Sequence, residues 1–246
     1  MSDKIKTKNG FTLSEVLITL VIIGIVAALT IPSAISKYQK QQTISQLKKT
    51  FSDFSQALKL SVPKYGDPVT WDYSLGTEDF FNRYLKPNFV KATEKTLGTS
   101  EMTYLTSSGG YENKGGSGVL ALRNGARVTV LNSGVIIYYQ ANSGIVVSEL
   151  IKNKCYVVDL NGLKKPNRFG RDAFYLCVDG ENGKIVPLAK NDSDVIAAPE
   201  RTREELKNGG SVDPQHYHCN STNGRGIWCA ALIIRDGWQI KDDYPW

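Results

Sequence analysis

Residues 16–31, VLITLVIIGIVAALTI, decide the fold of this chain. They are sixteen consecutive residues without a charge, and only Thr19 and Thr30 among them are polar. Counted from Phe11 to Ile31, the apolar segment has twenty-one residues, and a helix of that length is about 32 Å long. The hydrocarbon core of a bilayer is roughly 30 Å thick. The segment therefore predicts a helix that spans a membrane.

The flanks of this segment predict its orientation. Lys4, Lys6 and Lys8 precede it, and cations tend to stay on the cytoplasmic side of a membrane helix. The longer, C-terminal part of the chain is therefore expected outside. That part contains all of the cysteines, which are Cys155, Cys177, Cys219 and Cys229. Disulfides persist in such an oxidising compartment.

The composition of the chain is that of an ordinary globular protein. Of its 246 residues, 41% are apolar and 22% are charged, which excludes a disordered chain, a collagen and a polytopic membrane protein. The net charge is +6, of which three lysines and one aspartate in the first ten residues contribute +2. The remaining cations are scattered and are not interleaved with aromatic residues, so no specific nucleic-acid binding is predicted.

One acidic residue, Glu15, lies inside the apolar segment. A secretory signal peptide cleaved after Ala34 and a plain signal anchor both leave it unexplained. An intramembrane acid costs on the order of 2.5–3.5 kcal/mol and is by default a functional residue. A third interpretation of the N-terminus, which gives Glu15 a function, comes from the residues just before it.

Residues 8–15, KNGFTLSE, resemble the processing site of type IV prepilins and type II secretion pseudopilins. The similarity comprises a short basic leader ending in Gly10, then Phe11 and Glu15, the apolar run and Pro32. In that family a membrane-bound prepilin peptidase cuts after the glycine and methylates the new amine. The resemblance implies that processing occurs between Gly10 and Phe11.

The resemblance also implies a division of the chain. Residues 1–10 are the leader, and residues 11–62 are a long N-terminal helix. Its first half, 11–32, spans the membrane and polymerises, and its second half, 33–62, is amphipathic. Residues 63–246 form a globular, β-rich head.

Two residues of the helix carry expected roles in assembly. Glu15 is expected to pair with the terminal amine of a neighbouring subunit, because the acid is most costly when alone and least costly when paired. The alternative is an acid that reaches the membrane interface. Pro32 removes a backbone hydrogen bond and is expected to kink or locally melt the helix near Thr30–Ile31. Its alternative role is merely to mark the helix exit from the bilayer.

The amphipathic half has one apolar stripe, formed by Ile35, Tyr38, Ile44, Leu47, Phe51, Phe54 and Leu58. Such a stripe needs a surface to cover, and a sheet from the remaining chain is the expected partner. A coiled coil would need a sustained heptad repeat, which this segment lacks. The helix is expected to end before Pro63.

From residue 63 onward, short runs with strand composition alternate with turn residues. Strands are predicted at Val119–Leu122, Ala126–Leu131, Val135–Tyr139, Ile145–Leu150, Tyr156–Leu160, Ala173–Val178, Lys184–Leu188 and Ile227–Ile234. Turns are expected at residues 124–125, 132–134 and 179–183, a Gly/Ser-rich loop at 106–118, and short helices at Thr77–Leu85 and Glu200–Lys207. The sum is an α+β fold of the pilin type, a long N-terminal helix packed on a mainly antiparallel β-sheet.

A turn-rich segment between the predicted strands gathers oxygen side chains, from Asp159, Asn161, Asn167 and Asp172. Calcium needs six or more oxygens, and Asp159, Asn161 and Asp172 are the candidate ligands. The segment lacks the third acid and the bidentate Glu of an EF-hand loop. The interpretation that we favour is a turn whose Asx side chains accept hydrogen bonds from backbone amides. No other cofactor is expected.

The cysteines and histidines allow two interpretations. His216, His218 and Cys219 lie together, but their spacing fits no common zinc pair. Four cysteines permit three connectivities, and among these we expect the disulfides Cys155–Cys177 and Cys219–Cys229. No nucleophile elbow, phosphate-binding loop or metalloprotease motif occurs in the sequence, so an enzyme is not predicted.

The sequence thus predicts a structural subunit of a type IV pilus or type II secretion pseudopilus. Its expected partners are other pilin or pseudopilin subunits, prepilin peptidase and an inner-membrane assembly platform. We expect it first as a single-pass protein of the bacterial inner membrane with the head outside, and then in an extracellular or periplasmic filament. The alternative is a secreted or membrane-anchored extracytoplasmic binding protein.

Overall fold

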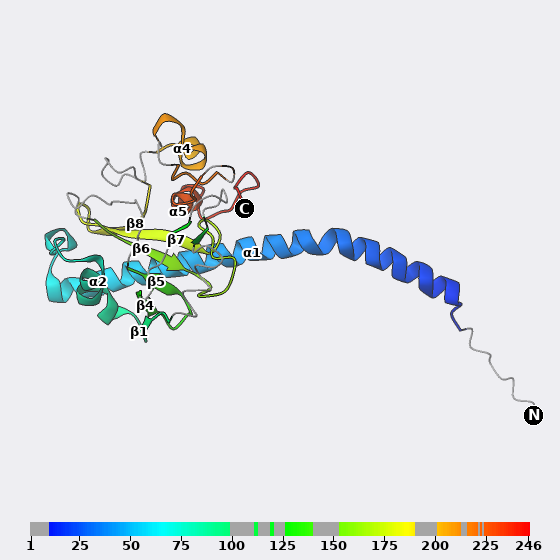
Figure 1. Ribbon diagram of the computed structural model, residues 1–246, viewed down its shortest axis with the longest axis horizontal. Coiled ribbons are helices and arrows are strands. Elements are labelled where there is room, and N and C mark those ends of the chain that lie inside the picture. Colours follow the sequence, from blue (N-terminus) through cyan, green and yellow to red (C-terminus); the bar gives the residue numbers. More distant parts are fainter. Residues whose placement is uncertain are drawn as a thin grey trace, which may run out of the picture. The chain divides into compact units, whose positions relative to one another are not determined.

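The computed structural model describes residues 10–98, 111–112, 119–120, 126–139, 153–189, 201–212, 216–220, 222 and 224–246. The chain divides into two compact units, Met1–Gln42 and Thr43–Trp246. Helix α1, Leu13–Tyr65, contributes its first part to one unit and its second part to the other (Figure 1). From here on, the head is this second unit, which includes the last part of α1 as well as residues 63–246.

The part of α1 that belongs to the head is amphipathic, as its sequence predicts, but the buried face begins later than expected, since Ile35 is 51% and Tyr38 69% exposed. Its buried residues are Thr43, Leu47, Thr50, Phe54, Ala57, Leu58 and Ser61. Most are three or four positions apart and therefore share one face of the helix. The ring centroid of Phe54 lies 5.2 Å from that of Phe89 and 6.0 Å from that of Tyr156 on the sheet. This face of α1 covers the sheet.

The end of α1 corrects one expectation. We expected the helix to end before Pro63, but it continues through Pro63 to Tyr65. Proline there removes one N–H donor. The ring of Tyr65 compensates by packing on Tyr84 and Trp71, with centroids 5.0 and 6.5 Å apart. Gly66, with a φ of 77°, then ends the helix in the left-handed conformation that glycine adopts without strain.

The head contains a six-stranded antiparallel sheet in the order β1-β4-β5-β6-β7-β8. The strands are β1 Thr93–Thr96, β4 Arg127–Val130, β5 Ile136–Tyr138, β6 Asn153–Asp159, β7 Ala173–Asp179 and β8 Lys184–Pro187. A separate pair is formed by β2 Tyr111–Glu112 and β3 Val119–Leu120. Together with α1, this sheet confirms the predicted α+β class.

The centre of the sheet is covered on both faces. All seven residues of β7 are buried, which a strand with one solvated face does not show. Helix α5, Cys229–Arg235, contacts β7 and β8. Figure 1 shows α5 and α4, Arg203–Asn208, on one side of strands β6–β8 and the head part of α1 on the other.

The predicted strands from residue 119 to 188 agree with the structure wherever it describes them, within one to three residues at their ends. The predicted strand at Ile145–Leu150 and the turn at 124–125 lie outside the described residues. The predicted short helices correspond to α2, Thr77–Phe80, continued by a π-helical turn at Phe81–Leu85, and to α4. Further 3₁₀ turns occupy Pro68–Thr70, Lys86–Asn88 and Gly210–Val212.

Three further predictions about the head are wrong. The loop expected at 106–118 contains the strand β2, Tyr111–Glu112. The run Ile227–Ile234, expected to be a strand, is mostly the helix α5. A continuous apolar run does not distinguish a strand from a helix that is enclosed on all sides, and five consecutive residues from Cys229 to Ile233 are buried here. Strand β1 was not expected at all. It is an edge strand with all four residues exposed, so it has no apolar alternation.

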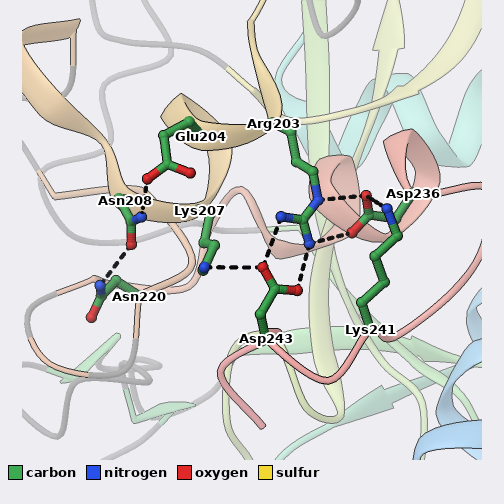
Figure 2. A network of polar contacts seen from close by, with 8 residues as sticks. All are labelled: Arg203, Glu204, Lys207, Asn208, Asn220, Asp236, Lys241 and Asp243. Carbon is green, nitrogen blue, oxygen red and sulfur yellow. Dashed lines mark hydrogen bonds and ion pairs between the residues drawn. The ribbon is translucent and has the colours of Figure 1, made fainter.

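A polar network fixes the C-terminal segment to α4 (Figure 2). The guanidinium of Arg203 donates to both carboxylate oxygens of Asp236, at 2.7 and 3.0 Å. It also donates to both oxygens of Asp243, at 2.8 and 2.7 Å. Lys241 adds a second cation 2.8 Å from Asp236, and Lys207 lies 3.0 Å from Asp243. Arg203 therefore joins two carboxylates that are distant from it in sequence.

Candidate processing and assembly site

The first turn of α1 is closed by a reciprocal pair of side chains. The backbone N–H and hydroxyl of Thr12 donate to the carboxylate of Glu15, at 2.8 and 2.9 Å. The backbone N–H of Glu15 donates to the Thr12 hydroxyl at 3.3 Å. This is a capping box, which satisfies N–H groups that the first turn of a helix leaves without partners. The Thr-x-x-Glu spacing was visible in the sequence, but the role of Thr12 was missed.

The two residues of the expected cleavage position lie outside the helix. Gly10 and Phe11 precede the first helical residue, Leu13. Both are exposed, and the side chain of Phe11 is 89% exposed. Apart from Gly10 and its chain neighbours, no atom of the described residues lies within 4 Å of the place where a side chain on Gly10 would begin. The Gly10–Phe11 bond is therefore accessible and free of helical hydrogen bonding, as a peptidase requires.

The apolar part of α1 exposes its side chains on all sides. From Leu13 to Ile31, the large apolar residues have exposed fractions between 41% and 79%. By length and composition, α1 is a helix that can cross a membrane. So much contiguous apolar surface is not stable in water. An apolar environment must therefore cover it.

Hydroxyl groups within the apolar part are satisfied within the helix. Thr19 donates to the carbonyl of Val16 and Thr30 to that of Val26, each at 2.9 Å. Buried hydroxyls without partners are costly in hydrocarbon, so these contacts make the segment compatible with a membrane interior. Helix α1 runs through Pro32, and Thr30 and Ile31 are helical in this structure. A kink at Pro32 stays a prediction.

The four cysteines form the two disulfides expected from the sequence. Cys155 and Cys177 are directly opposite each other on β6 and β7, with Cα atoms 4.0 Å apart. Cys219 is bonded to Cys229, the first residue of α5, with Cα atoms 5.0 Å apart. They join neighbouring strands in one case and a loop to a helix in the other.

The Cys219–Cys229 bond decides between the two interpretations of the histidine segment. The ring centroids of His216 and His218 are 5.8 Å apart, with His216 exposed and His218 buried. The sulfur of Cys219 is bonded to another sulfur and is not a thiolate ligand. Among the described residues, no group of three or more His, Cys, Asp or Glu side chains has the arrangement of a metal site.

The oxygen-rich segment is held together by its own side chains. The carboxylate of Asp172 accepts hydrogen bonds from the backbone N–H groups of Asn167 and Arg168, at 2.8 and 2.6 Å, and from the amide of Asn161 at 3.1 Å. Asp159 accepts from the N–H of Asn161 at 3.2 Å. Burial raises the pKa of the Asp172 carboxyl above its usual value, although these hydrogen bonds act in the opposite direction and lower it. The contacts are those of a structured turn, and both Asp172 oxygens are engaged within it.

Two family models match this chain, and they cover different parts of it. A model of the prokaryotic N-terminal methylation motif, which is the prepilin-type cleavage and methylation signal of type IV pilins and pseudopilins, matches residues 5–31. A model described as a family of unknown function (DUF6613) matches residues 33–246. No curated protein and no solved structure matches the chain.

Proposed function

Since the chain belongs to the DUF6613 family and begins with a prokaryotic N-terminal methylation motif, we propose that it is a structural subunit of a type IV pilus or type II secretion pseudopilus. Prepilin peptidase removes residues 1–10 and methylates the amine of Phe11. The subunit is stored in the bacterial inner membrane with its head outside. It then polymerises with other pilin or pseudopilin subunits at an inner-membrane assembly platform.

The observation that carries this proposal is an acid at the start of an apolar, uncovered helix. Glu15 in the monomer is satisfied by Thr12 of the same chain. Cleavage after Gly10 creates a positive amine at Phe11, and N-methylation keeps its charge. A neighbouring amine offers Glu15 a charged partner in a medium of low dielectric constant, where such pairs are strong. When Glu15 exchanges its contact with Thr12 for the amine of a neighbouring subunit, the association of the helices is favoured. The pair also sets the axial position of one helix relative to the next.

The first experiment determines the mature N-terminus by intact-mass and peptide mass spectrometry on chain taken from the membranes of its own host. The expected product starts at Phe11 and carries one additional methyl group. A chain that starts near Ile35 would instead support the secreted binding protein. A chain that still starts at Met1 would support a plain anchored protein.

Assembly is tested by Glu15→Gln, which keeps hydrogen-bonding capacity toward Thr12 but removes the negative charge. We expect normal cleavage, normal membrane insertion and at least about a tenfold loss of filaments, the effect of about 1.4 kcal/mol per contact. Ser14→Ala is the matched control, because Ser14 is exposed and lies outside the capping box. Filament yield unchanged in Glu15→Gln, or lost equally in Ser14→Ala, would contradict the proposed pairing.

The alternative, an extracytoplasmic binding protein, requires a ligand site in the head. A groove of about 220 Å³ lies between α1 and the β4–β5 turn, with Lys49, Asp53, Phe89 and Leu131 among its lining residues. It is small for a ligand site, since most are 300–1,000 Å³. The mature N-terminus distinguishes this alternative from the subunit, because a secreted binding protein loses the apolar segment.

A further inference from the structure

The residues that follow the apolar part of α1 are cationic, and the first acid after them, Asp53, pairs with Lys49 at 2.7 Å. Lys37, Lys40, Lys48 and Lys49 all lie in this stretch, and no acidic residue occurs between Glu15 and Asp53. Cations close to the translocated end of a membrane helix are disfavoured by the positive-inside bias. Export of the head therefore gives no reason for lysines at this place. A ligand on the outer side of the membrane would give such a reason.

The length of the uncharged segment places two of these lysines at a membrane surface. Residues 16–36 are twenty-one residues without a charge, and α1 is helical throughout them. They span about 32 Å, against roughly 30 Å for the hydrocarbon core. In the stored monomer, before any pairing in a filament, Glu15 lies at one boundary, where an unpaired acid is least costly, and Lys37 lies at the other. Lys40 is about 4.5 Å further along the helix. Lys48 is about 12 Å further along the helix than Lys40 and lies beyond the headgroup layer.

The side chains at this boundary are those that bind headgroups. Tyr38 is 69% exposed, and tyrosine is enriched where its ring contacts acyl chains and its hydroxyl contacts headgroups. Helical side chains lean toward the N-terminus of their helix, which for Lys37 and Lys40 is toward the membrane. Their ammonium groups can therefore reach lipid phosphates while their methylene chains cover apolar surface.

We propose that Lys37, Tyr38 and Lys40 bind the headgroups of anionic phospholipids in the leaflet on the head side of the membrane. The inference rests on the proposed function, because it requires residues 16–36 to be retained as a membrane helix. The ligand is a lipid phosphate within the bilayer, since the tyrosine and the lysine methylene chains need acyl chains beside them. Free phosphate does not supply this second contact.

The test uses the full chain in phosphatidylcholine vesicles that contain a trace of spin-labelled phosphatidylglycerol or spin-labelled phosphatidylcholine. Electron spin resonance gives the fraction of each lipid immobilised by the protein. We expect the native chain to prefer phosphatidylglycerol, and K37Q/K40Q to weaken that preference by up to roughly fivefold for each lysine. The leader lysines are present in every variant and cancel in the comparison.

The matched control is K48Q/K59Q. It removes the same charge from the same helix, at exposed positions beyond the predicted headgroup layer. Its phosphatidylglycerol preference should stay at the native value. An unchanged preference in K37Q/K40Q would overturn the inference, and so would an equal loss in both variants, which would indicate unspecific charge attraction.

The failure of this inference is distinguishable from failure of the proposed function. A chain that matures to Phe11 and assembles, but shows no lysine-dependent lipid preference, contradicts only the lipid contact. A chain cleaved after Ala34 contradicts both, and intact mass reports that outcome before any lipid is added. Preference that is abolished by free phosphate at unchanged ionic strength would show a site for the soluble anion and would also overturn the inference.

Discussion

Removal of the Arg203 guanidinium tests how the C-terminal segment is held. The side chain of Asp236 is only 2% exposed, whereas that of Asp243 is 44% exposed. Arg203→Gln takes the principal cation away from both, but only Asp236 is then left as a buried charge. Breaking a buried pair by removing one partner costs about 3–5 kcal/mol. Because Lys241 stays 2.8 Å from Asp236, we expect a loss of about 2–3 kcal/mol in the free energy of unfolding of the head.

Lys207→Gln is the matched control within the same network. Lys207 contacts only the exposed carboxylate, Asp243, at 3.0 Å. Exposed ion pairs contribute roughly 0.2–1 kcal/mol, so the control should lose less than about 1 kcal/mol. The assay is urea unfolding of the full chain in detergent micelles, followed by tryptophan fluorescence and extrapolated linearly to zero denaturant.

Arg203→Gln should also change how the stability of the head depends on pH. Burial raises the pKa of Asp236, but hydrogen bonds from Arg203 and Lys241 outweigh it and the pKa lies below its usual value. In the native chain its stabilising contribution is thus present above the unfolded-state pKa and is lost as pH falls through the lower folded-state pKa. In Arg203→Gln, the effect of burial on the pKa of Asp236 outweighs that of Lys241, and we expect its folded-state pKa to lie above its unfolded-state pKa. The stability of the variant therefore falls as the pH rises from the unfolded-state pKa to the folded-state pKa.

The gap in stability between the native chain and Arg203→Gln should therefore narrow from pH 7 to pH 4. Three results would refute this reasoning. One is a free energy of unfolding for Arg203→Gln that lies within about 0.5 kcal/mol of the native value. The second is an equal loss in Lys207→Gln, and the third is a gap that widens as the pH falls.

Three other substitutions test the packing of the head by thermal unfolding of the full chain. Gly170→Ala should lower the free energy of unfolding by more than about 3 kcal/mol, because φ is 79° and a Cβ would meet the Sγ of Cys229. Gly134→Ala, with φ of 84° but open space around it, should lower it by only about 1 kcal/mol. Equal losses in the two variants would contradict the steric argument. Thr202→Ala removes the capping box of α4 and should cost about 1 kcal/mol, whereas no change would mean that packing alone holds α4. Phe54→Ala should lose about 3–5 kcal/mol, since this ring is fully buried, and a loss below about 1 kcal/mol would show that α1 does not anchor the core.

Local patterns explain what could be predicted about the head. The run at 173–178 is a strand between two turns, and the structure has β7 there. Asp179 begins the following turn by accepting hydrogen bonds from the N–H groups of Glu181 and Asn182. These features depend on neighbours within a few positions, which is the range over which propensities and turn chemistry act.

Contacts between distant segments explain what could not be predicted. Helix α5 is helical although its apolar run fits a strand equally well, because it is enclosed by the sheet and by its disulfide to Cys219. The carboxylates that Arg203 holds are 33 and 40 positions away in sequence. Pro63 stays helical because Tyr65 has aromatic neighbours from a later segment. None of these partners is visible within one stretch of residues.

The sequence by itself determined the N-terminal methylation motif at residues 5–31, the apolar segment within it, and the α+β class. A peptidase reads a short contiguous peptide, and a bilayer measures the length of one uninterrupted apolar run, so both properties are local. Only the tertiary structure decided that residues 229–235 are the helix α5 and that Arg203 pairs with Asp236 and Asp243. Side-chain geometry and burial select among conformations that local propensity leaves nearly equal in energy.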